Sequence, residues 1–166
     1  RVAALLSNDT AMLDAYSNGI DLHRNTAAAV AGLPLDKVTD AQRTSAKAIN
    51  FGTLYGSVPA GLARSATLDY GVAMTTAEAR KALNRLTGTY PELTMWKAQK
   101  VVEATMQRTV TTRLGLVRDF DKQGEGYLKG ECQNIPVQGS AGEVLLSSIA
   151  RLPAALQGLD AKLYHN

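Results

Sequence analysis

Cysteine, histidine and long apolar runs are scarce in this 166-residue chain. Its single cysteine, Cys132, has no partner for an internal disulfide, and its two histidines, His23 and His165, lack the spacing of metal ligands. No apolar run reaches the length of about 18 residues that a membrane-spanning helix needs, and no secretory leader is visible. We therefore expect no disulfide, no metal ligands within the chain and no membrane partner, as is typical of a reducing, intracellular setting.

Aromatic residues make up only 5% of the chain, whereas 45% is hydrophobic, and much of that share is alanine and leucine. This balance favours a mainly α fold over a β-sandwich. The length suits a single unit with a core of its own. The formal charge of +3 is compatible with a polyanionic partner, but it is too small to predict one by itself.

Helix signals recur along most of the chain. Two capping boxes, each a threonine followed three residues later by Gln or Glu, predict helices that begin after Thr39 and Thr75. Pro91 is typical of the first position of a helix. The predicted helices span residues 2–7, 9–16, 23–31, 40–55, 60–69, 76–87, 92–109 and 138–152, the last ending at a proline.

Strand signals are few. The β-branched residues on both sides of Gly115 predict a short hairpin over residues 109–120. The glycine-rich stretch 122–130 is expected to be a loop. Residues 160–165 predict a strand whose partners lie partly outside the chain.

Four side chains form a stripe along the helix predicted from residue 40. They follow one another at intervals of four, so each lies about 40° round the helix from the last, and the stripe is roughly 18 Å long. Its order, two cations and then two aromatics, suits a nucleoside triphosphate lying along the helix, with phosphates at the N-terminal end, where the helix dipole favours anions. Spacing alone also allows a solvated cationic face beside a partial core. The four residues are Arg43, Lys47, Phe51 and Tyr55.

Residues 42–56, QRTSAKAINFGTLYG, resemble motif B of the family A DNA polymerases. The resemblance implies that Arg43 holds the outer phosphates of an incoming dNTP and that Lys47 meets the α-phosphate and donates a proton to the leaving pyrophosphate, which makes Lys47 the catalytic residue of the segment. Phe51 is implied to pack against the sugar. Tyr55 is implied to stack near the templating base, with Gly56 as the pivot of a closing helix.

A second segment, DLHRNTAA at residues 21–28, is similar to the family's Asp-Ile-His-x-x-Thr-Ala. The resemblance implies that His23 touches the triphosphate, although a lone histidine is more often a helix-surface residue. A third, QNIPVQGSA at residues 133–141, resembles the segment that meets the primer–template minor groove. There Asn134 and Gln138 are implied to test base-pair shape through their amides, the alternative being a polar loop and helix cap.

The ends of the chain resemble the approaches to two further motifs. Arg1 corresponds to the last residue of motif A, and residues 160–166 to the strand that enters motif C, so we expect the carboxylates that bind two Mg²⁺ ions to lie outside the chain. By itself the chain is therefore expected to be inactive. It departs from the family at residues 115–118, GLVR in place of a glycine and three arginines, and at Gly130, where a basic residue is common, which implies fewer phosphate contacts to the duplex.

The resemblance covers nearly the whole chain and implies a helical fingers subdomain at about 9–108, with palm pieces at 1–8 and 109–166, a short β-hairpin and a truncated palm strand. The implied function is template-directed addition of dNTPs to a primer 3′ end. The implied partners are primer–template DNA, dNTP and the remainder of the palm and thumb, in the cytoplasm of a bacterium or phage-infected cell. Two alternatives are a single-subunit RNA polymerase, which has methionine at the place of Phe51, and an inactive nucleic-acid-binding remnant.

Overall fold

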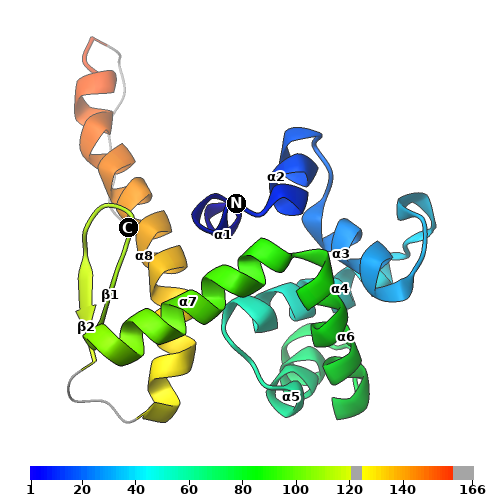
Figure 1. The fold of residues 1–166 in the computed structure, drawn as a ribbon. Coiled ribbons are helices and arrows are strands. Elements are labelled where there is room, and N and C mark those ends of the chain that lie inside the picture. Colours follow the sequence, from blue (N-terminus) through cyan, green and yellow to red (C-terminus); the bar gives the residue numbers. More distant parts are fainter. Residues whose placement is uncertain (121–124, 159–166) are drawn as a thin grey trace.

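The computed structural model describes residues 1–120 and 125–158, and within them the fold is mainly α, as predicted. The described part has eight α-helices, one short 3₁₀ turn and one two-stranded antiparallel hairpin (Figure 1). The helices are α1 (Val2–Ser7), α2 (Thr10–Ser17), α3 (Leu22–Ala31), α4 (Asp40–Leu54), α5 (Pro59–Tyr70), α6 (Thr76–Thr89), α7 (Pro91–Gln107) and α8 (Glu125–Ala155), with the 3₁₀ turn η1 at Leu35–Lys37 and the strands β1 (Thr109–Thr111) and β2 (Val117–Asp119).

The local capping signals explain where several helices begin. Both predicted capping boxes are present: Thr39 and Gln42 bond reciprocally at the start of α4, and Thr75 and Glu78 do so at the start of α6. Pro91 occupies the first turn of α7, where its missing N–H has no cost. Because these signals depend on neighbours in sequence, the predicted and observed starts agree.

The main core lies among α1, α2, α4, α5, α6 and α7, and its bulkiest members include Tyr90, Leu62 and Trp96. A second, smaller core joins the C-terminal half of α7 to the hairpin and α8 through Val110, Phe120 and the fully buried Cys132. Helix α7 belongs to both, and in Figure 1 it runs from the α4–α6 group to the hairpin. It therefore sets the position of one part against the other.

The hairpin is fastened to α8 through the backbone of its turn. Glu143 accepts hydrogen bonds from the backbone N–H groups of Leu114 and Leu116, both at 3.1 Å, and from Thr112 Oγ1 at 2.7 Å. A Cβ on Gly139 would lie 2.5 Å from Thr112 Cγ2, so this close approach of helix and hairpin requires glycine. The hairpin prediction is confirmed, with strands shorter than expected.

Helix α8 contradicts two predictions. It is a continuous helix of 31 residues from Glu125 to Ala155, so the loop expected at 122–130 is wrong for residues 125–130, and the helix neither starts at 138 nor stops at Pro153. A proline inside a helix removes one backbone hydrogen bond. At Pro136 that loss is outweighed by burial, because Cys132, Gln133 and Pro136 itself are all buried there. The strand expected at 160–165 lies outside the described residues.

Within the described ranges, none of the helices has both the length and the apolar character needed to cross a membrane.

Candidate nucleotide site on helix α4

The predicted stripe lies on one face of α4 and is continued by the residue that ends the helix. Lys47 is exposed, and Arg43 and Phe51 are half-buried. Tyr55, the C-cap residue, is 42% exposed and stacks on Phe51 with ring centroids 6.1 Å apart. The ring of His23, on α3, lies 5.9 Å from that of Phe51. The fold thus brings His23 to the aromatic part of the stripe, and its contact with a triphosphate stays a prediction.

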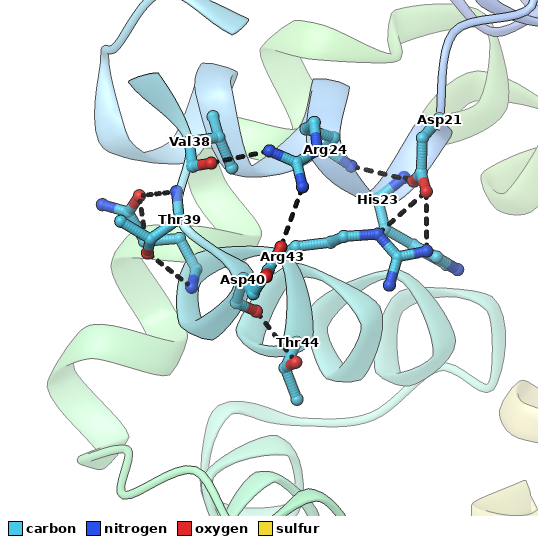
Figure 2. Close-up of polar contacts among 9 residues, drawn as sticks. Asp21, His23, Arg24, Val38, Thr39, Asp40, Arg43 and Thr44 are labelled. Carbon is cyan, nitrogen blue, oxygen red and sulfur yellow. Dashed lines mark hydrogen bonds and ion pairs between the residues drawn. The ribbon is translucent and has the colours of Figure 1, made fainter. Parts of the chain in front are cut away.

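Arg43 is held by the carboxylate of Asp21. Its Nε and Nη2 donate to Asp21 Oδ2 at 2.8 and 2.6 Å, and Asp21 Oδ1 accepts from the backbone N–H groups of His23 and Arg24, capping α3 (Figure 2). Burial raises the pKa of Asp21, but the hydrogen bonds from Arg43 and from the backbone outweigh it, and the pKa lies below its usual value. Asp21 therefore links the start of α3 to the stripe.

A second tie joins the same two helices. Arg24 donates to the carbonyl of Val38 at 2.7 Å and to Asp40 Oδ1 at 2.9 Å, just beside the capping box of Thr39 (Figure 2). Asp40 is the first residue of α4. The N-terminal end of α4, which carries the cationic part of the stripe, is thus fixed to α3 by two arginine–aspartate pairs.

His23 lies near the cations, and its pKa is lowered from the usual value for histidine. Its Nδ1 is 2.9 Å from Asn50 Nδ2. Burial lowers the pKa of His23; Asp21 acts in the opposite direction, and Arg43 and Lys47 lower it further. A neutral imidazole can offer one N–H or one lone pair to a ligand, but no ionic attraction.

Lys47 points to a partner that sequence reasoning missed. Its Nζ lies 6.0 Å from the ring centroid of Tyr70, the last residue of α5, in a cation–π arrangement. Within the described part of the chain, Lys47 forms no ion pair with a carboxylate. Its charge is therefore available to a phosphate. No local sequence signal relates two residues this far apart, because their contact depends on how α5 packs on α4.

The residues predicted to meet DNA approach one another at the end of α4. Gln138 Nε2 donates to Tyr55 Oη at 2.9 Å, which joins α8 to the aromatic end of the stripe. Gly56 follows with φ of 69°, a left-handed conformation that glycine adopts without strain. Asn134 is four residues before Gln138 on α8 and so lies on the same face of that helix. Gly56, Asn134 and Gln138 thus lie next to Tyr55 or on the helix that contacts it.

No acidic or metal-ligating cluster accompanies this surface in the described residues: nowhere in them do three or more His, Cys, Asp or Glu side chains gather in a way that could hold a metal ion. What the arrangement offers instead is two cations and two stacked aromatic rings along α4, with a histidine of α3 beside them. Cations with N–H donors suit a polyphosphate, and aromatic faces suit a base or sugar.

The fold is that of a fragment of a polymerase domain. The fold matches the solved POL domain of Pol1 from M. smegmatis, determined in complex with DNA primer-template and dNTP, with a TM-score of 0.83 and 25% sequence identity. The match covers 95% of this chain and 28% of that one. The family model of DNA polymerase family A matches residues 1–165, and the chain belongs to that family.

Among its relatives, the chain is 34% identical over 171 residues to DNA polymerase I of Pseudomonas aeruginosa and 34% identical over 165 residues to DNA polymerase I of Aquifex aeolicus. Each alignment covers 98% of this chain, but only 18% and 28% of the respective relative. The chain thus spans less than a third of the length of these proteins.

Proposed function

We propose that this chain is the nucleotide-handling segment of a template-directed DNA polymerase that adds dNTPs to a primer 3′ end. In this proposal residues 9–108 are the fingers, and residues 1–8 and 109–166 are pieces of the palm. The observation that carries it is the single row formed by His23 and the α4 stripe. Membership of DNA polymerase family A favours DNA over RNA as the product.

Each residue of the row has a role that its chemistry suits. Lys47, exposed and without a carboxylate partner among the described residues, donates a proton to the leaving pyrophosphate. Arg43 exchanges Asp21 for the outer phosphates, and His23 donates a hydrogen bond to the same group. Phe51 packs on the sugar, and Tyr55 stacks near the templating base.

The primer–template side of the proposal rests on the end of α4 and on α8. Gln138 bonds to Tyr55 in the structure, and a bound duplex competes for both side chains. Asn134, on the same face of α8, offers its amide to the minor-groove acceptors that all base pairs share. Gly56 allows the chain to turn when α4 closes on a matched nucleotide.

The two Mg²⁺ ions that the family uses require carboxylates, and the described residues do not supply a cluster of them. We therefore assign the metal ligands to other parts of a polymerase, and we propose that this chain alone does not extend primers. Exposed apolar side chains support packing of a remaining palm and thumb: Leu5 of α1 and Val144 of α8 are more than half exposed and line a hollow of about 600 Å³. A location in the cytoplasm of a bacterium or of a phage-infected cell is part of this proposal.

The test is a chimera in which this chain replaces the matching segment of Pseudomonas aeruginosa DNA polymerase I. Primer extension is measured with dNTPs, with NTPs and with Mg²⁺ omitted. Extension with dNTPs supports the proposal, whereas extension with NTPs alone contradicts it. A folded chimera that binds primer–template but extends nothing favours the inactive remnant.

Within the chimera, Lys47→Ala tests the role of the proton donor. We expect turnover to fall by about 10²- to 10⁴-fold, the usual contribution of a general acid, with primer–template affinity unchanged. Lys81→Ala, which removes an exposed lysine of α6, is the matched control and leaves both quantities unchanged. Equal losses of turnover and duplex affinity in Lys47→Ala contradict the assigned role.

A further inference from the structure

A buried chain of hydrogen bonds ends on His23. Asn25 Nδ2 donates to Tyr90 Oη at 3.4 Å, Tyr90 Oη lies 2.9 Å from Thr26 Oγ1, and Thr26 Oγ1 donates to Asn50 Oδ1 at 3.0 Å. Asn50 Nδ2 then lies 2.9 Å from His23 Nδ1. The three middle members are almost inaccessible, with exposures of 0% for Thr26, 1% for Tyr90 and 7% for Asn50. Buried polar groups of this kind are costly unless each is satisfied.

The number of protons on these side chains determines which group donates and which accepts in each hydrogen bond. A hydroxyl has one proton, so Thr26, which donates to Asn50, must accept from Tyr90. Tyr90 in turn accepts from the amide of Asn25. With its oxygen engaged by Thr26, Asn50 presents its NH₂ to His23. The opposite direction requires the amides of both Asn25 and Asn50 to be turned over.

An N–H from Asn50 needs a lone pair on His23 Nδ1, which places the single proton of the neutral imidazole on Nε2. In the described part of the chain Nε2 has no hydrogen-bond partner, and it is not one of the buried atoms left without one, so it is accessible from outside. Protonation of Nδ1 would oppose the Asn50 amide. That conflict acts in the same direction as burial and as the charges of Arg43 and Lys47, while Asp21 acts against it.

We propose that Asn50 is a positioning residue that holds neutral His23 as its Nε2–H tautomer, so that one N–H donor stands beside Arg43 and Lys47 for a phosphate oxygen of a nucleoside triphosphate. The phosphate part rests on the proposed function, whereas the tautomer does not. His23 acts as a neutral donor, so its contact with phosphate persists as the pH rises above the pKa of the imidazole. A histidine that bound as a cation would lose the contact there.

The experiment is ¹⁵N–¹H correlation NMR of the imidazole groups of this chain. Only two histidines are present, so His165→Gln assigns the His23 signals. At a pH above the His23 pKa we expect the upfield, proton-bearing ¹⁵N signal to belong to Nε2 and the downfield signal to Nδ1. An Nδ1–H or evenly mixed tautomer in the unmodified chain overturns the proposal.

Asn50→Asp tests whether Asn50 is the cause. A carboxylate only accepts hydrogen bonds, so the proton should move to Nδ1, and the pKa of His23 should rise by about 1 to 3 units. Asn84→Asp makes the same change at an exposed position of α6 and should alter neither property. An unchanged tautomer in a folded Asn50→Asp chain contradicts the proposal.

Thr26→Val is the second variant, in case Asn50→Asp does not fold. It keeps the shape of the side chain but removes the donor to Asn50 Oδ1, so the amide is free to turn and the tautomers of His23 should become mixed. If His23 remains entirely Nε2–H in Thr26→Val, the buried hydrogen bonds do not determine its tautomer, and the proposal fails.

Titration with dATP separates this inference from the proposed function. We expect the Nε2–H proton signal of His23 to shift on binding, and to do so equally at pH values above the pKa. If the tautomer is as proposed but dATP leaves the signal unmoved, the phosphate role of His23 is wrong and the tautomer assignment stands. If the tautomer differs while dATP binds, the positioning role of Asn50 is wrong and the proposed function stands.

Discussion

Asp21 in the α3–α4 region and Glu143 in the hairpin–α8 region each hold a group from another element, but the two groups differ in kind. Asp21 holds the side chain of Arg43 on the exposed face of α4, whereas Glu143 holds the backbone N–H groups of Leu114 and Leu116 in the hairpin turn. A side chain can leave its partner for a ligand with little change in the fold. A backbone group cannot leave without loss of the turn. Arg43 can therefore exchange Asp21 for a ligand, whereas the hairpin turn stays bound to Glu143.

The largest expected effect on stability tests how closely the hairpin is packed on α8. In Gly139→Ala the new methyl group meets Thr112 Cγ2, and Thr112 is itself tied by hydrogen bonds to Glu143 and Leu116. We expect this overpacking to lower the free energy of unfolding by about 1 to 3 kcal/mol, measured by urea denaturation.

Two other glycine-to-alanine variants serve as comparisons for the stability of Gly139→Ala. Gly142→Ala, on the same helix with nothing near the new methyl group, should instead raise the free energy of unfolding by about 0.5 to 1 kcal/mol. In Gly52→Ala the new methyl group would lie 2.8 Å from Leu62 Cδ1, against 2.5 Å from Thr112 Cγ2 in Gly139→Ala, so the cost should be smaller. If Gly52→Ala proves the more costly, the α3–α4 region is the more rigid, and the comparison is reversed.

The next effect concerns Asp21, which serves two partners at once. Asp21→Ala removes the cap of α3 and should lower the free energy of unfolding by about 1 kcal/mol. Asp21→Asn keeps a capping side chain and loses mainly a partly exposed ion pair, so its cost should be only a few tenths of a kcal/mol. Thermal or urea unfolding of the two variants measures the difference.

The same Asp21→Asn variant should bind dATP up to about fivefold more tightly, since Arg43 no longer has to leave a carboxylate. Glu143→Gln is the control and should leave dATP affinity unchanged while it speeds hydrogen exchange at the amides of Leu114 and Leu116. Weaker dATP binding by Asp21→Asn would mean that Asp21 positions Arg43 rather than competing with the ligand.

Lowering the pH should destabilise both regions for the same reason, because each contains a carboxylate with a lowered pKa. The pKa of Asp21 is lowered, as described above, and the pKa of Glu143 is lowered, first through the hydrogen bond from Thr112. A carboxyl whose folded-state pKa is depressed stabilises above its unfolded pKa of about 4, and the contribution is lost as the pH falls toward the folded pKa. The free energy of unfolding should therefore drop between about pH 5 and pH 3, less steeply in Asp21→Asn combined with Glu143→Gln.

The smallest effect is expected where the two regions touch through exposed side chains. Tyr55→Phe removes the hydrogen bond from Gln138 but keeps the ring that stacks on Phe51, so stability should change by less than about 0.5 kcal/mol. Chemical denaturation of both chains decides this. A larger loss of stability would show that the Tyr55–Gln138 hydrogen bond holds the end of α4 on α8 and is not a weak contact that a ligand can displace.

Prediction from sequence succeeded where the physical cause was local. Helix α4 begins at the predicted residue because the Thr39 capping box acts over three residues, and its stripe lies on one face because a regular helix repeats every 3.6 residues. It failed at α8, where local signals placed a loop before residue 131 and a stop at Pro153. There the burial of Pro136 and its neighbours stabilises a helix that propensity opposes.

The sequence alone determined the mainly α fold, the row of Arg43, Lys47, Phe51 and Tyr55, and the resemblance that family membership confirms. Those features depend on residue type and on spacing along the chain. Only the tertiary structure decided that Asp21 holds Arg43, that Glu143 holds the hairpin turn and that Asn50 faces His23. Each of these contacts joins residues more than 20 positions apart, and their meeting depends on how the helices pack, which no local pattern encodes.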